Sequence, residues 1–244
     1  MKKSIAYAKT EVLTIWRDKK ALVLIISFPI FFALLYGLVL GAFSEGKSNN
    51  FLAAIPSTLA TMTAFTCVNG SAGSVARTRE NKLFARLLLT NIKSMHLILG
   101  KVFYFLLITC MQTLLLLLTG SIFFGLALED IGWILFGTLM FAFFCLTLGI
   151  VLANLTDSED GAEHSTVLIS FMMLVLGAWF PVENMPDVAQ KIAHANPVFY
   201  FLKIINTILQ NGNVVDVIIP IIVIVVLCMV AFLMAIITFK KGNI

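Results

Sequence analysis

One stretch of the sequence matches a nucleotide-binding motif letter for letter. Residues 41–48 read Gly-Ala-Phe-Ser-Glu-Gly-Lys-Ser, which fits the phosphate-loop pattern G-x-x-x-x-G-K-S. That loop binds phosphate because a strand precedes it and a helix N-terminus follows it, inside an α/β domain. Here long apolar runs lie on both sides of the motif. We therefore interpret the match as coincidental and expect no nucleotide site in this chain.

A second cluster of reactive side chains lies in residues 154–164, NLTDSEDGAEH, which hold four carboxylates and no lysine or arginine. Carboxylates at close spacing can bind a divalent cation, but this run lacks the ligand spacing and the twelfth-position glutamate of a calcium loop. The pattern favours solvated charge on a flexible cytoplasmic loop, with contact to a basic patch of a partner as an alternative. The carboxylates belong to Asp157, Glu159, Asp160 and Glu163.

Other catalytic patterns are missing from the sequence. It contains no H-E-x-x-H zinc motif, and the segment Asn69-Gly-Ser71-Ala-Gly has Asn69 where an intramembrane serine protease has a glycine and lacks the histidine partner. No Asp, Glu, Lys, Arg or His lies in the middle of a long apolar run, where ion-coupled transporters usually keep such a residue. The four cysteines lie inside apolar runs without disulfide or zinc spacing, so we expect them to be packing residues. We expect no enzyme active site, no metal, no bound cofactor and no energy source within this chain.

The composition places these residues in a membrane. Of the 244 residues, 60% are hydrophobic and 12% are charged, and the mean hydropathy is +1.00. A soluble domain of this size carries more charge, and about 20 apolar residues suffice for a helix to cross the hydrocarbon core. We predict a single all-α transmembrane domain over residues 1–244 with six spans, at residues 21–43, 51–75, 99–124, 131–153, 164–181 and 214–238.

The distribution of lysine and arginine predicts the orientation of these spans. Residues 1–20 hold six such side chains, residues 77–101 hold six and the C-terminal end holds two, whereas the opposite face holds three. Because positive charge accumulates on the cytoplasmic side, both termini are expected in the cytoplasm of a bacterial cell, with the chain in its plasma membrane. Residues 1–20 are predicted to form an amphipathic helix at the membrane interface, and we expect no removable signal peptide.

Three prolines interrupt the chain after the fifth predicted span. Pro181, Pro186 and Pro197 lie within GAWFPVENMPDVAQKIAHANPVFY, residues 177–200, and proline ends or breaks a helix. Between them, DVAQKIAHAN reads as a short amphipathic helix with Asn184 as its N-cap. We predict an extracytoplasmic hinge with a re-entrant helix over residues 182–200, since irregular backbone at membrane depth must be shielded by protein or water. An external loop without a special role is the alternative.

The predicted cytoplasmic helix over residues 77–92 separates an apolar side from a basic side. Such a helix can dock onto a cytoplasmic partner, or it can simply lie at the membrane interface. The residues that we expect to carry docking are Arg79, Glu80, Leu83, Phe84, Arg86 and Leu87.

These two segments together resemble the permeases of type-2 ATP-binding-cassette exporters, in the branch that exports drugs, lipids or peptides. The hinge resembles the family signature at Gly177, Phe180-Pro181, Glu183, Met185-Pro186, Asn196-Pro197 and Tyr200. The cytoplasmic helix resembles the family's coupling pattern R-E-x-G-T-L-E-x-L-L-x-T-P at Arg79, Glu80, Phe84, Leu87, Leu88, Thr90 and the later Gly100-Lys101, and departs from it at Ala85, Arg86 and Asn91.

The resemblance implies partners and a mechanism. Two separate cytoplasmic ATPase subunits would bind ATP and Mg²⁺ and dock on residues 77–92, and a second permease protomer, identical or related, would pair with this chain among membrane lipids. No nucleic acid is expected. A hydrophobic or amphipathic cargo would leave the cell by alternating access, and a six-span channel or scaffold without ATP coupling is the alternative. The candidate pathway lining, from the second and fifth spans, is Thr61, Thr66, Met172 and Trp179.

Overall fold

All elements in the described part of the chain are helices, as the sequence predicts. A computed structural model describes residues 19–42, 47–80, 94–124, 130–156, 158–179, 182, 185–210, 212 and 214–241. Most of the predicted helix over residues 1–20 and most of the coupling helix over residues 77–92 therefore lie outside the described residues. The elements are α2 (Lys19–Ala42), α3 (Lys47–Ala64), η1 (Phe65–Asn69), α4 (Gly70–Glu80), α6 (Ser94–Phe124), α7 (Ile131–Leu155), α8 (Glu159–Leu174), η2 (Val175–Trp179), α9 (Asp187–Ala195), α10 (Pro197–Leu209) and α11 (Val214–Lys241).

Five helical segments of the described chain are long and apolar enough to cross a membrane, and they correspond to the second to sixth predicted spans. The first predicted span lies in α2, where the described apolar stretch, Ile25–Leu35, is shorter than a span. The count of six spans therefore stays a prediction at that helix. The five candidate spans are Leu52–Glu80, Leu99–Phe123, Ile131–Leu155, Glu159–Trp179 and Val215–Thr238.

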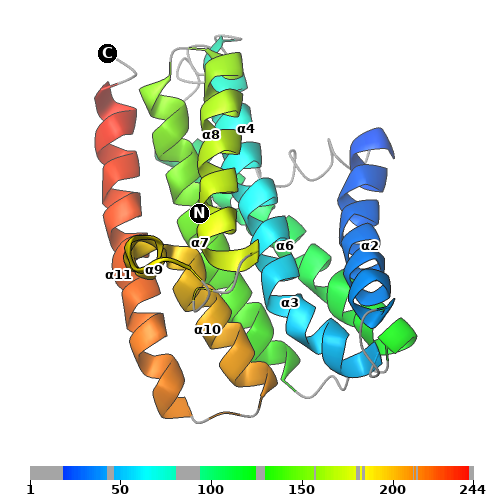
Figure 1. The fold of residues 1–244 in the computed structure, drawn as a ribbon. Coiled ribbons are helices and arrows are strands. Elements are labelled where there is room, and N and C mark those ends of the chain that lie inside the picture. The colour runs from blue at the N-terminus through cyan, green and yellow to red at the C-terminus, as the bar shows by residue number, and fades with distance from the viewer. Residues whose placement is uncertain are drawn as a thin grey trace.

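The helix α7 is the centre of the bundle. It contacts α3, η1, α4, α6, α8, α10 and α11, and Figure 1 shows the long helices arranged around it. Its side chains Phe141, Ala142, Cys145 and Leu146 are fully buried.

We name the two ends of the bundle after residues there. The Glu80 end holds the end of α4, the α7–α8 turn and the end of α11, and the Asp130 end holds the start of α7 and the α10–α11 connection (Figure 1).

Two predicted boundaries shift outward at the Glu80 end. The second span continues to Glu80 and the fifth begins at Glu159, whereas we predicted residues 75 and 164. The prediction of a flexible loop over residues 154–164 is therefore wrong in its second half. Ser158 is the N-cap of α8, since its hydroxyl accepts a hydrogen bond from the Gly161 amide at 3.1 Å. Acidic residues in a first turn interact favourably with the helix dipole, which extends the helix into the acidic run.

The hinge contains a helix that the sequence analysis missed. After α9 the chain forms α10, an apolar helix whose Val198, Phe201, Ile204 and Ile205 are buried, and Phe201 stacks on Phe141 of α7 with ring centroids 4.5 Å apart. At 1.5 Å per residue α10 is about 20 Å long, too short to cross a core of about 30 Å. Figure 1 shows α10 running from the end of η2 toward the Asp130 end of the bundle.

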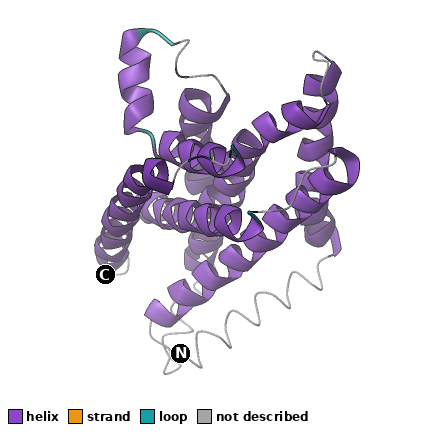
Figure 2. Cartoon of the chain, turned by 90° about the horizontal axis from the view of Figure 1, so that it is seen from below, coloured by secondary structure: helices purple, strands orange, loops and turns teal. Residues whose placement is uncertain are grey.

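The short amphipathic helix α9 is present and begins at Asp187, as the predicted segment DVAQKIAHAN does, but its predicted N-cap is wrong. Its N-cap is Pro186, and Asn184 precedes that position by two residues, so Asn184 is not the cap. The extended backbone at Pro186 determines where the first turn can start. The main contacts of α9 are with α10 and η2. Figure 2 shows it projecting from the packed helices.

The closest approach of two helices generates a testable prediction. A Cβ atom added at Gly149 of α7 would collide with the Val68 carbonyl oxygen of η1 and with the Ser71 hydroxyl, whereas one added at Gly132 of the same helix meets nothing within 4 Å. Because a carbonyl oxygen of the backbone cannot rotate away, Gly149→Ala should cost about 1–3 kcal/mol of stability. Thermal unfolding of the purified protein measures this cost. Gly132→Ala is the control and should change stability by less than about 0.5 kcal/mol, and equal unfolding temperatures for the two variants would contradict the packing described.

Candidate functional site: the Glu80 end and the second–fifth span interface

Arg79 of α4 binds the end of α7. Its Nη1 donates to the Ala153 carbonyl at 3.1 Å, and its Nη2 donates to the Thr156 carbonyl. The last carbonyls of a helix have no partner within the helix, and the guanidinium presents several donors in a rigid fork that can serve two of them at once. Arg79 therefore caps α7 and joins the second span to the fourth.

Two further side chains of α4 bind the start of α8. Arg77 pairs with Glu159, with its Nη2 at 2.6 Å and its Nε at 2.7 Å from the same carboxylate oxygen. Glu80 accepts a hydrogen bond from the Glu159 amide at 2.5 Å, at the positive end of the α8 dipole. We call Arg77, Arg79 and Glu80 the α4 clamp. The clamp joins the end of the second span to the turn between the fourth and fifth spans.

Lys101 ties α6 to the same part of α4. Its ammonium group donates to the Ser74 carbonyl and hydroxyl, both at 2.6 Å, and to the Thr78 hydroxyl at 2.7 Å. The side chain is 3% exposed, so these bonds replace the water that its charge loses on burial. Residues 81–93 connect α4 to α6, and both helices next to this connection are thus bound to the rest of the bundle.

The predicted docking residues divide into two groups. Arg79 and Glu80 lie in the α4 clamp and bind other parts of this chain. Leu83, Phe84, Arg86 and Leu87 lie outside the described residues, and docking through all six stays a prediction. The sequence analysis missed the roles of Arg77 and Glu159. The sequence signal that could have predicted their pairing is that they carry opposite charges at neighbouring ends of the second and fifth spans.

The pathway candidates are brought together only in part. The Trp179 indole of η2 donates to the Thr61 hydroxyl of α3 at 3.2 Å, which links the fifth span to the second. Thr66 instead donates to Gln112 of α6 at 3.0 Å. Met172, on α8, is 55% exposed and faces away from the bundle interior. Their role in a pathway stays a prediction.

The second and fifth spans each contain one buried polar atom without a partner among the described residues. Within the described residues, the Asn69 side-chain oxygen in η1 and the Ser170 hydroxyl in α8 are buried without a hydrogen-bond partner. Both spans contain a π-helical segment, η1 and η2, and such segments frequently occur at functional sites. Buried polar atoms usually find partners, so each of these two positions is suited to bind a water molecule or a polar group.

The hinge is held to the fifth span by Asn196. Its amide donates to the Met173 carbonyl at 2.6 Å, and its side-chain oxygen accepts from the Val198 amide at 3.0 Å as the N-cap of α10. A Cβ at Gly177 would lie 3.0 Å from a Val198 methyl group and 3.1 Å from the side-chain nitrogen of Asn196. This lack of space explains why residue 177 is a glycine. Pro197 opens α10, where its fixed φ suits the first helical position.

The structure bears only in part on three other predictions: the hinge residues, the phosphate-loop match and the absence of a metal site. Pro181 and Glu183 of the hinge lie outside the described residues, while Pro186 and Pro197 flank α9 as helix boundaries. The phosphate-loop match at residues 41–48 follows α2, a helix, so the strand that such a loop needs does not precede it. Among the described residues, no group of three His, Cys, Asp or Glu side chains could hold a metal ion.

Comparison with known proteins finds one matching family model and two related permeases. The family model described as "ABC-2 type transporter" matches residues 4–209. The chain is 34% identical over 95 residues to the putative transport permease YvfS of Bacillus subtilis, an alignment covering 34% of this chain and 37% of that protein. It is 25% identical over 174 residues to the linearmycin resistance permease protein LnrN of the same organism, covering 71% of this chain and 44% of that protein. The chain thus spans less than half the length of these relatives.

The α4 clamp generates a prediction about stability. Arg79→Ala leaves the Ala153 and Thr156 carbonyls without their donor, and hydrogen bonds from a charged group contribute about 1.5–3 kcal/mol. Arg77→Ala removes an ion pair whose arginine is 65% exposed, worth about 0.2–1 kcal/mol. Thermal unfolding should therefore show a larger loss for Arg79→Ala than for Arg77→Ala. The reverse order would mean that the exposed ion pair, and not the cap, holds the helix ends together.

Proposed function

This chain belongs to the ABC-2 type transporter family, and on that premise we propose that it is the membrane-spanning subunit of an ATP-driven exporter. It is a multi-pass membrane protein with several helices able to span the bilayer. ATP and Mg²⁺ bind on separate ATPase subunits in this proposal, and the chain itself supplies the route and the mechanical linkage. The observation that carries the proposal is the α4 clamp. It connects the segment after Glu80 to three of the spans.

Energy enters through residues 81–93 in this proposal. Two ATPase subunits, one for each permease protomer, bind the apolar side of the segment through Leu83, Phe84 and Leu87. Arg86, at the edge of this interface, fixes the position in which the ATPase binds the segment. A displacement of this segment moves the end of α4, and the clamp passes that movement to α7 and α8 because their ends are hydrogen-bonded to α4. The second and fifth spans then tilt, and the site exposed to the cytoplasm opens to the other side.

A second protomer completes the pathway in this proposal. The outer face of α8 exposes Val167, Leu168, Phe171 and Met172, and the projecting helix α9 exposes Val188 and Ile192, at 72% and 52%. An apolar surface that extends from a span onto a projecting helix suits a protein partner better than lipid alone. Pairing across this face, with an identical or a related protomer, would enclose Trp179 and Met172 between the two chains. Thr61 lies directly behind Trp179, whereas Thr66 would line the path from deeper in the bundle.

The cargo in this proposal is a hydrophobic or amphipathic compound such as a drug, lipid or peptide. Trp179, Phe171 and Met172 present exposed apolar surface on the fifth span, and the Phe171 and Trp179 rings pack edge to face with centroids 5.4 Å apart. One relative is named a linearmycin resistance permease, and resistance is most simply achieved by removing a compound from the cell. That supports export as the direction. The excess of lysine and arginine at the Glu80 end supports cytoplasmic termini in a bacterial plasma membrane.

Docking of the ATPase is the experiment that tests this function. Buried apolar anchors at an interface commonly contribute about 2 kcal/mol or more, and rim charges contribute much less. Phe84→Ala combined with Leu87→Ala should therefore reduce ATPase co-purification and export severely, while Lys82→Ala should retain both. The permease should still insert, since these residues lie outside the candidate spans. Full ATPase retention and unchanged export in the double variant would favour a channel or scaffold without ATP coupling.

The proposed orientation has its own test. Single cysteines introduced at Lys47, Asp187 or Arg86, in a background without the four native cysteines, can be labelled in intact cells with an impermeant thiol reagent. Positions 47 and 187 should react, because they lie on the face with few positive charges. Position 86 should react only after the cells are permeabilised. Labelling of position 86 alone in intact cells would invert the orientation and place the proposed docking segment outside the cytoplasm.

A further inference from the structure

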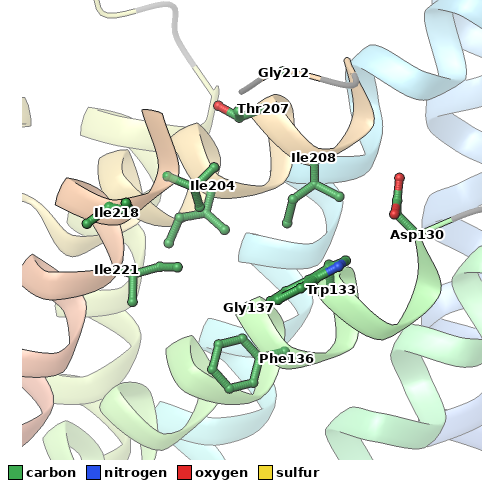
Figure 3. A pocket seen from close by; sticks show the side chains of 11 residues that line it. Asp130, Trp133, Phe136, Gly137, Ile204, Thr207, Ile208, Gly212, Ile218 and Ile221 are labelled. Atoms are coloured by element: carbon green, nitrogen blue, oxygen red, sulfur yellow. The ribbon is translucent and has the colours of Figure 1, made fainter. Parts of the chain in front are cut away.

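A groove between α7 and α11 has no part in the proposed transport pathway. At the Asp130 end it contains a cavity of about 310 Å³, where α7, α10 and α11 meet (Figure 3). A second cavity of about 380 Å³ follows directly along α7 and α11 as far as Phe143 and Phe232, and Phe136 lines both cavities. We call the two cavities together the α7–α11 groove.

The groove has the length and the position of a lipid tail. From Asp130 to Phe143 the helix α7 advances about 20 Å at 1.5 Å per residue. The tails of one bilayer leaflet cover about 15 Å, half of the hydrocarbon thickness. The rim residues Trp133, Phe136 and Met229 are at least half exposed, so the groove opens sideways, toward the lipid around the bundle. A compact ligand would fill only one cavity, whereas an extended acyl chain fills both.

The polar groups at the mouth of the groove select the headgroup. Asp130 is the N-cap of α7, but its side chain makes no capping hydrogen bond, and no ion pair with it is found among the described residues. The Thr207 hydroxyl donates its hydrogen to the Lys203 carbonyl, so toward the groove it can only accept. Figure 3 shows Thr207 at the upper edge of the cavity, beyond Ile208, and Asp130 at its side, next to Trp133. A carboxylate and an accepting hydroxyl are complementary to a cationic group that carries N–H donors.

We propose that the α7–α11 groove binds a membrane phospholipid whose headgroup ends in a primary amine. The ammonium group lies beside Asp130, and one acyl chain follows α7 past Phe136 to the deeper cavity. Trp133, with its apolar ring and indole N–H, lies on the rim at headgroup depth, as tryptophan does in membrane proteins generally. The bound lipid fills the space between α10 and the two long helices, and so supports the part of the hinge that contacts α7. The site is independent of the cargo and of the direction of transport.

The headgroup is tested with the purified full-length protein. The protein is stripped of lipid in mild detergent and offered phosphatidylethanolamine, phosphatidylcholine or phosphatidylglycerol with identical acyl chains. Native mass spectrometry then measures the bound fraction. Phosphatidylethanolamine should bind about two- to fivefold more tightly than the others, the ratio expected for a partly exposed ion pair. Phosphatidylcholine is zwitterionic like phosphatidylethanolamine, but its quaternary ammonium group has no N–H donors, and phosphatidylglycerol is anionic. Equal binding of the three lipids, or a preference for phosphatidylglycerol, would overturn the proposal.

Matched variants test the two ends of the groove separately. Asp130→Asn should abolish the headgroup preference and Asp130→Glu should restore it. Asp216→Asn should leave the preference unchanged, because Asp216 is an exposed carboxylate of α11 that does not line the groove. Val225→Trp should fill the deeper cavity and weaken the binding of all three lipids several-fold. Val226→Trp, on the lipid-facing side of the same helix, should not. An equal effect of Asp130→Asn and Asp216→Asn, or of the two tryptophan variants, would place the lipid elsewhere.

Discussion

The structure depends on one constraint: inside a membrane every backbone polar group needs a partner within the protein. A straight helix meets this requirement by itself, but the described chain is full of departures from straight helices. It has two π-helical segments, a hinge after the fifth span and several helix ends at the Glu80 end. Side chains of other helices supply hydrogen bonds at several of these places. Arg79 serves the end of α7, Asn196 serves the Met173 carbonyl next to η2, and Ser71 donates to the Leu146 carbonyl at 3.2 Å.

These hydrogen bonds run between helices, and this links the backbone requirement to the proposed function. Arg79 lies on the second span and caps the fourth, and Asn196 precedes α10 and binds the fifth. A helix whose end is capped by a neighbour cannot tilt alone without exposing the capped carbonyls, which costs about 1–3 kcal/mol for each group left unpaired. Movements of the second, fourth and fifth spans are therefore coupled. An exporter driven from one end needs such coupling, because its ATPase subunits contact only that end.

Much of this arrangement can be predicted from sequence. The apolar runs are long enough to identify the second to sixth spans, and proline positions 186 and 197 mark the boundaries of α9 and α10. The family resemblance of residues 79–90 and 177–200 agrees with the match to the ABC-2 type transporter family. These features are local, since they follow from a continuous run of apolar residues or from the missing amide of a proline. They need no knowledge of what packs against them.

Other features were decided only by the tertiary structure. The acidic residues from Glu159 onward read as solvated charge until Arg77 and Glu80 are placed beside them. No element was predicted over residues 201–209, where the structure has α10 with Phe201 stacked on Phe141. Thr61 and Thr66 look equivalent in sequence, but one faces Trp179 and the other Gln112. The sequence by itself determined which segments enter the membrane, because transfer into lipid depends on the composition of each segment. Only the tertiary structure decided which polar groups meet, because those partners lie more than forty residues apart and come together when the helices pack.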